Sequence, residues 1–142
     1  MTETKSQLIG EFTGYNDGAV FRLNNGQIWQ QRRYKYQYKY KYRPHVRIYP
    51  DGGRWMAEFD CMTDPIEVVR SSLLDEGAIT SDFKGFDGDA RFTFNSGRVW
   101  RQAEYKYCYH YAHRPTAMIV DGVNGVVLHV DGMSDTVRVR RD

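Results

Sequence analysis

Tyr34-Lys35-Tyr36-Gln37-Tyr38-Lys39-Tyr40-Lys41-Tyr42 is the stretch that decides the fold of this chain. Tyrosine alternates strictly with a polar residue, which is the period-two pattern of a β-strand. A related stretch, Tyr-Lys-Tyr-Cys-Tyr-His-Tyr-Ala-His, occupies residues 105–113. Successive side chains of a strand point to opposite faces, so each stretch gathers its tyrosines on one face. The sequence therefore predicts two tyrosine-lined strands.

The two stretches belong to an internal repeat. A shift of 71 residues aligns residues 10–70 with residues 81–141 without a gap. The matched pairs include Phe12 with Phe83, Gly14 with Gly85, Trp29 with Trp100, Gln31 with Gln102, Arg43-Pro44 with Arg114-Pro115, Met62 with Met133, and Asp64 with Asp135. A shared register of this length predicts two copies of one fold, each built around its tryptophan. We expect one domain at residues 1–70, a linker at residues 71–78 with a single helical turn at 73–76, and a second domain at residues 79–142.

Each copy reads as a series of short strands joined by tight turns. In the first copy the alternation places strands at residues 8–15, 19–24, 27–42, 45–49, 54–59 and 66–69. Trp29 is an odd-numbered position and the tyrosines are even, so a bend or bulge is expected within residues 30–33 and again within 101–104. This pattern predicts an all-β chain of two tandem SH3-like antiparallel small barrels.

One further pattern carries a resemblance. It runs Phe-x-Gly-aromatic, then Phe-x-Leu/Phe-x-Asn-x-Gly-x-Ile/Val-Trp-x-Gln, at residues 12–15 with 21–31 and at residues 83–86 with 92–102. An aromatic strand and a final Met-x-Asp-x-Ile/Val-x-Val follow. The pattern resembles a module of uncharacterised bacterial proteins built from tandem small β-barrels. The resemblance implies a bacterial protein without enzymatic activity, and it names no ligand.

Composition narrows the class of protein. The 142 residues are 41% hydrophobic and 27% charged, as in a globular chain, and the formal net charge of +2 does not by itself indicate nucleic-acid binding. The beginning of the chain is polar, and no apolar run approaches a membrane helix. Cys61 and Cys108 occupy different positions in the two copies, so a disulfide is not indicated. We expect a cytoplasmic protein that does not contact a membrane.

Enzyme signatures are missing from the sequence. We find no glycine-rich phosphate loop and no strong metal-ligand spacing, and His110 and His113 fall on opposite faces of their strand. Cys108 and His110 share a face and could form a thiol–imidazole pair. The first copy has Gln37 and Lys39 at those positions, which favours a variable outer face instead. We expect no catalytic residues, no metal and no cofactor.

The tyrosine strands allow three interpretations. The tyrosines could be half-buried core with the lysines forming a solvated face. They could line an interface between chains. In the first copy they could stack on the bases of a single-stranded nucleic acid while basic residues neutralise its phosphates. Residues 32–47 hold seven basic residues and no acidic one, which motivates the third interpretation.

Two sets of candidate binding residues follow. The first set would bind a polyanion and consists of Arg33, Lys35, Lys39, Lys41, Arg43 and Arg47. The second set would mediate self-association and consists of Tyr107, Tyr109, Met118, Val120 and Val127, with the last three predicted to be apolar residues facing outward. We therefore expect a binding protein that forms a homo-oligomer, a dimer in the first instance. The alternative is binding of single-stranded nucleic acid or another polyanion through the first copy.

Overall fold

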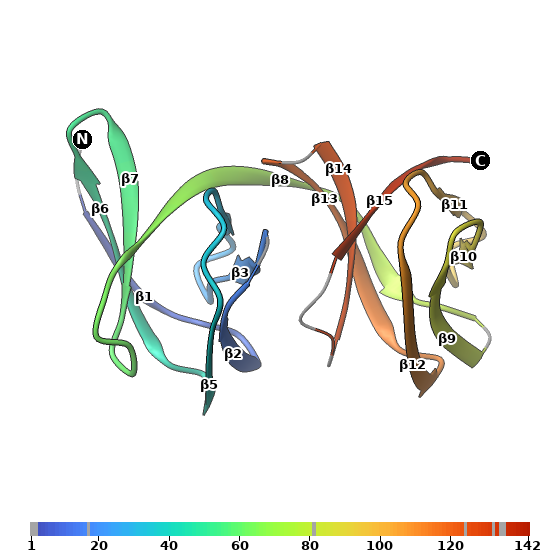
Figure 1. The fold of residues 1–142 in the computed structure, drawn as a ribbon, viewed down its shortest axis with the longest axis horizontal. Coiled ribbons are helices and arrows are strands. Elements are labelled where there is room, and N and C mark those ends of the chain that lie inside the picture. Colours follow the sequence, from blue (N-terminus) through green and yellow to red (C-terminus); the bar gives the residue numbers. More distant parts are fainter. Residues whose placement is uncertain (1–2, 17, 81, 124, 132, 134–135) are drawn as a thin grey trace. The chain divides into compact units, whose positions relative to one another are not determined.

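The computed structural model describes residues 3–16, 18–80, 82–123, 125–131, 133 and 136–142 (Figure 1). The described residues form strands and turns without a helix, and every strand pairing is antiparallel, so the predicted all-β class is confirmed. Within this part of the chain, nothing has the length and apolarity of a membrane-spanning helix. The chain divides into two compact units, Met1–Ser71 and Ser72–Asp142, which we call unit 1 and unit 2.

Unit 1 contains one sheet and one separate strand pair. Its strands are β1 (Thr4–Gln7), β2 (Glu11–Tyr15), β3 (Val20–Arg22), β4 (Ile28–Gln31), β5 (Gln37–Tyr42), β6 (His45–Asp51), β7 (Arg54–Phe59) and the first part of β8 (Ile66–Ala78). The sheet has the order β1-β6-β7-β8-β4-β3, and β2 pairs with β5 beside it. The predicted strand at residues 27–42 is therefore two strands, β4 and β5.

Unit 2 likewise contains one sheet and one separate strand pair. They are the second part of β8, β9 (Asp82–Asp87), β10 (Arg91–Thr93), β11 (Val99–Gln102), β12 (Tyr107–His113), β13 (Thr116–Gly122), β14 (Gly125–Val130) and β15 (Thr136–Arg141). The sheet has the order β8-β13-β14-β15-β11-β10, and β9 pairs with β12. Asp135, which the repeat matches to Asp64, lies outside the described residues.

Strand β8 belongs to both units. Its residues 66–71 pair with β7 and β4, and its residues 72–78 pair with β13. The residues predicted to be a linker therefore lie within this strand, and the helical turn predicted at 73–76 is wrong. The reason is that pairing with β13 satisfies the backbone groups of these residues, which local sequence could not reveal.

The strand pairings leave each sheet open. In unit 1 the described residues make only an isolated bridge between the ends of the order, from Leu8 to Leu23, and in unit 2 the equivalent bridge joins Ile79 and Phe94. The pairings among the described strands thus do not form a closed barrel. Each bridge is flanked by further backbone hydrogen bonds, such as Ile9 N to Arg22 O at 2.8 Å.

Each unit has a core of its own. Trp29 lies in the core of unit 1 beside a cluster of phenylalanines, and Trp100 lies in the core of unit 2; both indoles are buried. The indole N–H of Trp100 donates to the buried carboxylate of Asp75 at 3.0 Å, and that of Trp29 donates to Gln27 at 3.1 Å. Each tryptophan is thus buried in the core of its own unit, as the sequence predicted for the two indoles.

Candidate functional site

The main surface feature of each unit is a row of exposed tyrosines. In unit 1 the row follows β5 and the residues before it: Tyr34, Tyr36, Tyr38, Tyr40 and Tyr42. In unit 2 it follows β12 and the residues before it: Tyr105, Tyr107, Tyr109 and Tyr111. All nine side chains are between 51% and 91% exposed. We call these rows the tyrosine faces of unit 1 and unit 2. The first of the three interpretations, tyrosines as half-buried core, is therefore wrong.

In unit 2 the opposite side of the tyrosine strand faces its own unit. In unit 2, Cys108 and Ala112 pack against the core, and the ring of His110 lies 6.5 Å from that of Phe83. Small apolar side chains on this side leave the tyrosines to point outward, because a strand offers only two faces. Along one strand, successive tyrosines of the row are separated by about 6.7 Å.

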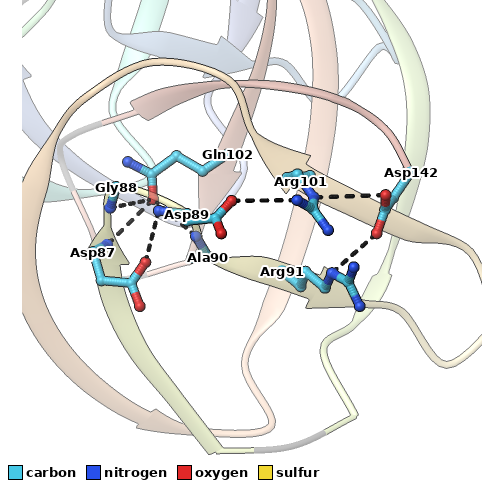
Figure 2. Close-up of polar contacts among 8 residues, drawn as sticks. All are labelled: Asp87, Gly88, Asp89, Ala90, Arg91, Arg101, Gln102 and Asp142. Atoms are coloured by element: carbon cyan, nitrogen blue, oxygen red, sulfur yellow. Dashed lines mark hydrogen bonds and ion pairs between the residues drawn. The ribbon is translucent and has the colours of Figure 1, made fainter.

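Buried glutamines fix the bend that precedes each tyrosine strand. The carboxamide oxygen of Gln102 accepts hydrogen bonds from the backbone N–H groups of Asp87, Gly88 and Ala90 (Figure 2). Its nitrogen donates to the carbonyls of Glu104 and Lys106. Figure 2 shows the side chain pointing into the turn at residues 87–90. In unit 1, Gln31 accepts from Asn16 N and donates to the carbonyls of Arg33 and Lys35. The strand breaks at residues 32–36, which overlaps the predicted bend at residues 30–33.

Ion pairs complete the frame around this turn in unit 2. Arg101 lies between Asp89, at 3.4 Å, and Asp142, at 3.5 Å, and Arg91 lies 3.1 Å from Asp142 (Figure 2). Their charges are balanced within the group. We therefore assign these residues to support of the bend rather than to ligand binding.

An acidic side chain lies beside a hydroxyl group of each tyrosine face: Glu11 beside Tyr40 and Asp82 beside Tyr111. The hydroxyl of Tyr40 donates to Glu11 at 3.2 Å, and desolvation followed by the Glu11 charge raises the pKa of Tyr40. In unit 2 the equivalent position to Glu11 is Asp82, 2.8 Å from the imidazole of His113. The hydrogen bond with His113 is the main reason that the pKa of Asp82 lies below its ordinary value. Sequence reasoning did not single out these acids, and no pattern along the chain marks them.

Most of the predicted polyanion-binding residues form an ion pair with a carboxylate side chain of the same chain. The closest nitrogen–oxygen distances are Arg33 to Glu67, 3.0 Å; Lys35 to Asp64, 3.5 Å; Lys41 to Asp60, 3.1 Å; and Arg47 to Glu3, 2.9 Å. Arg43 is half-buried and takes a positive φ of 51° before Pro44. Lys39 is exposed, and within the described part of the chain no carboxylate lies within 4 Å of it. The charge available to a polyanion is thus much smaller than the sequence suggested.

The predicted self-association residues divide into two groups. Tyr107 and Tyr109 are exposed on the tyrosine face of unit 2. Met118, Val120 and Val127 are buried, so the prediction that they form an exposed apolar surface is wrong. They lie outside the core cluster of unit 2, and the chain itself covers them.

Unit 1 also carries an open groove of about 680 Å³ beside β1, β6 and β7. Its walls carry Lys5, Arg47 and Glu58 among other residues. Arg47 pairs with both Glu3 and Glu58, and Lys5 lies 4.0 Å from Glu3. Because these charges are already paired with each other, the groove offers less to a charged ligand than its lining suggests.

Cys61 and Cys108 are both free thiols. Among the residues that the structure describes, no cluster of three or more His, Cys, Asp or Glu side chains could hold a metal ion.

Comparison of the chain with known protein families, with curated proteins and with solved structures finds no match. Function is therefore inferred from the residues themselves, and the tyrosine faces are the candidate site.

Proposed function

We propose that the chain is a non-enzymatic binding protein that associates with a second copy of itself through the tyrosine face of unit 2. The observation that carries this proposal is the exposure of nine tyrosines in two rows. Exposed aromatic groups of this number are rare on a surface that contacts only water. Tyrosine buries much apolar area at a small cost in conformational entropy, and it is enriched in protein interfaces.

The proposal includes a duplicated SH3-like small barrel as the scaffold of both faces. Strand registers 71 residues apart support it: Gly14 pairs with Tyr38, and Gly85 pairs with Tyr109. An ion pair at equivalent positions of the two units supports it as well, with the acidic and basic residues exchanged. Arg33 binds Glu67 at 3.0 Å, and the equivalent residues Glu104 and Arg138 pair at 2.8 Å. The isolated bridges across each open sheet are consistent with a small barrel held together by few closing contacts.

The test of self-association is sedimentation velocity over a wide range of protein concentration. We expect a reversible dimer whose population rises with concentration. The double variant Tyr38→Ser, Tyr109→Ser removes one exposed tyrosine from each face and should shift the equilibrium toward monomer, with an unchanged circular dichroism spectrum. A wild-type protein that remains monomeric at the highest concentration would contradict the proposal.

A second candidate function is binding of single-stranded nucleic acid by unit 1. The observation that favours it is Lys39, an exposed ammonium group on the face opposite Tyr38 and Tyr40, whose rings could stack on bases. Fluorescence anisotropy with a labelled single-stranded oligonucleotide tests it at two salt concentrations. Affinity that falls with salt and falls again in Lys39→Gln supports the candidate. Absence of binding at low salt removes it.

A cytoplasmic location is also part of the proposal. The free thiols of Cys61 and Cys108 support it, because cysteines in the reducing cytoplasm usually remain unpaired.

A further inference from the structure

The tyrosine strands β5 and β12 each pair on one side only. Among the described strands, β5 pairs with β2, and β12 pairs with β9. The second edge of each strand therefore presents backbone N–H and C=O groups that can accept another strand. Both pairings contain the same irregularity in register, so a bulge does not distinguish the two edges.

The two edges differ in the side chains that alternate with the tyrosines. β5 carries Lys39 and Lys41, and both faces of this strand are exposed. At the equivalent positions β12 carries His110 and Ala112. Lysine on an edge strand discourages pairing with another chain, because two copies would bring like charges together. Lys41 is paired with Asp60, so among the described residues Lys39 is the unpaired charge that protects the edge of β5, and β12 has no lysine at either position.

We propose that the protein dimerises by antiparallel pairing of β12 with β12 of a second copy. This inference rests on the proposed function, since it assigns the self-association to one strand. In a pair related by a two-fold axis, both copies use the same edge. No β12 edge is then left over, so the assembly ends at a dimer. Tyr107, Tyr109 and Tyr111 of the two copies would then form one continuous face with aromatic cross-strand pairs.

The same geometry leaves the tyrosine face of unit 1 free in the dimer. Two β5 strands paired in the same way would place Lys39 and Lys41 of one copy opposite lysines of the other. Unit 1 thus presents its basic and aromatic strand to solvent while unit 2 holds the copies together.

A reciprocal exchange of side chains between the two strands tests the assignment. The variant His110→Lys, Ala112→Lys gives β12 the lysines of β5, and we expect its dimer dissociation constant to rise at least about tenfold. The fold should accept these lysines, because unit 1 already carries Lys41 paired with Asp60, and Asp131 is the equivalent of Asp60. The matched variant Lys39→His, Lys41→Ala gives β5 the side chains of β12. It should produce species larger than a dimer, since the edges of both β5 and β12 can then pair with another copy.

A scan of cross-links gives a second measurement that does not depend on charge. Single cysteines are placed at each position from 107 to 111 in a background without the thiols of Cys61 and Cys108, and the protein is oxidised mildly. In a two-fold pair, one residue of β12 lies directly opposite the same residue of the second copy. We therefore expect a sharp maximum of disulfide-linked dimer at one position within β12, and no disulfide-linked dimer for Tyr38→Cys on β5.

The outcomes separate the two proposals. A wild-type protein that is monomeric in sedimentation velocity overturns both. A dimer that resists His110→Lys, Ala112→Lys and cross-links poorly along β12 overturns the strand assignment, while self-association through another surface stands. A loss of dimer accompanied by loss of the cooperative thermal transition points to misfolding, and the cross-link scan then decides.

Discussion

At the scale of single residues, Tyr15 differs from the tyrosines of the exposed row. Its ring is buried against Phe12 and Phe59, and its hydroxyl donates to the carbonyl of Asp64 at 2.7 Å. Burial, followed by the charges of Cys61 and Asp64, raises the pKa of Tyr15 well above its ordinary value of 10.0. Unit 2 has Phe86 at the equivalent position, so this part of the fold accepts a ring without a hydroxyl.

The raised pKa of Tyr15 predicts a loss of stability at alkaline pH. The folded state favours the neutral hydroxyl, so this contribution to the free energy of unfolding is fully present below pH 10. It is lost as the pH rises from there through the raised pKa of the folded state. We expect Tyr15→Phe to cost about 1 kcal/mol at neutral pH through the lost hydrogen bond, and to lose less stability than the wild type above pH 10. Urea unfolding followed by tryptophan fluorescence across this pH range measures both effects. Parallel losses in the two proteins would contradict the assignment.

At the scale of elements, two glycines allow the tyrosine strands to approach their partners. Gly14 lies opposite Tyr38 with φ of 98°, and Gly85 lies opposite Tyr109 with φ of 97°. A Cβ atom built on either glycine would collide with a backbone carbonyl oxygen of the neighbouring tyrosine strand. The pairing of β9 with β12 therefore requires glycine for space as well as for its backbone conformation.

Comparison of two glycines in unit 2 separates these requirements. Gly97 has φ of 90°, and a Cβ there would meet nothing within 4 Å. We expect Gly97→Ala to cost about 1 kcal/mol through backbone strain alone. Gly85→Ala should cost about 2–4 kcal/mol, because the carbonyl of Cys108 must also move. Chemical unfolding gives both values, and equal losses would show that the collision is relieved without cost.

The alternation in sequence predicted the tyrosine strands but could not predict which of their faces is exposed. A period of two defines two faces and leaves open which one packs on the core. In the second copy, the small apolar residues Cys108 and Ala112 could have indicated the buried face, since such residues between tyrosines fit against a packed core. The ion pairs of Lys35 and Lys41 were not predictable, because Asp64 and Asp60 approach only through folding of distant segments.

At the scale of the whole molecule, β8 explains how one chain carries two units without a separate linker. Residues 71–78 lack alternation and contain serine and glycine, so sequence alone favoured a connection. The equivalents of residues 75–78 in unit 1 are the residues of β1, where Thr4 pairs with Ile48 as Asp75 pairs with Ile119. The last strand of unit 1 and the first strand of unit 2 are thus continuous. Tertiary pairing rather than local pattern makes this segment a strand.

The division within β8 predicts where the chain can be shortened. Pairing with β4 ends at Ser71, and every member of the unit 1 core cluster precedes it. We expect the fragment of residues 1–71 to fold alone, with a β-type circular dichroism spectrum, a cooperative thermal transition and a stability of only a few kcal/mol, as for other domains of this size. The fragment of residues 1–65 lacks the strand that carries Ile66 and Val68 of this core, and it should be unfolded under the same conditions. If residues 1–71 are as unfolded as residues 1–65, unit 1 depends on the second half of β8 or on unit 2 for its stability, and the boundary at Ser71 does not mark an independent domain.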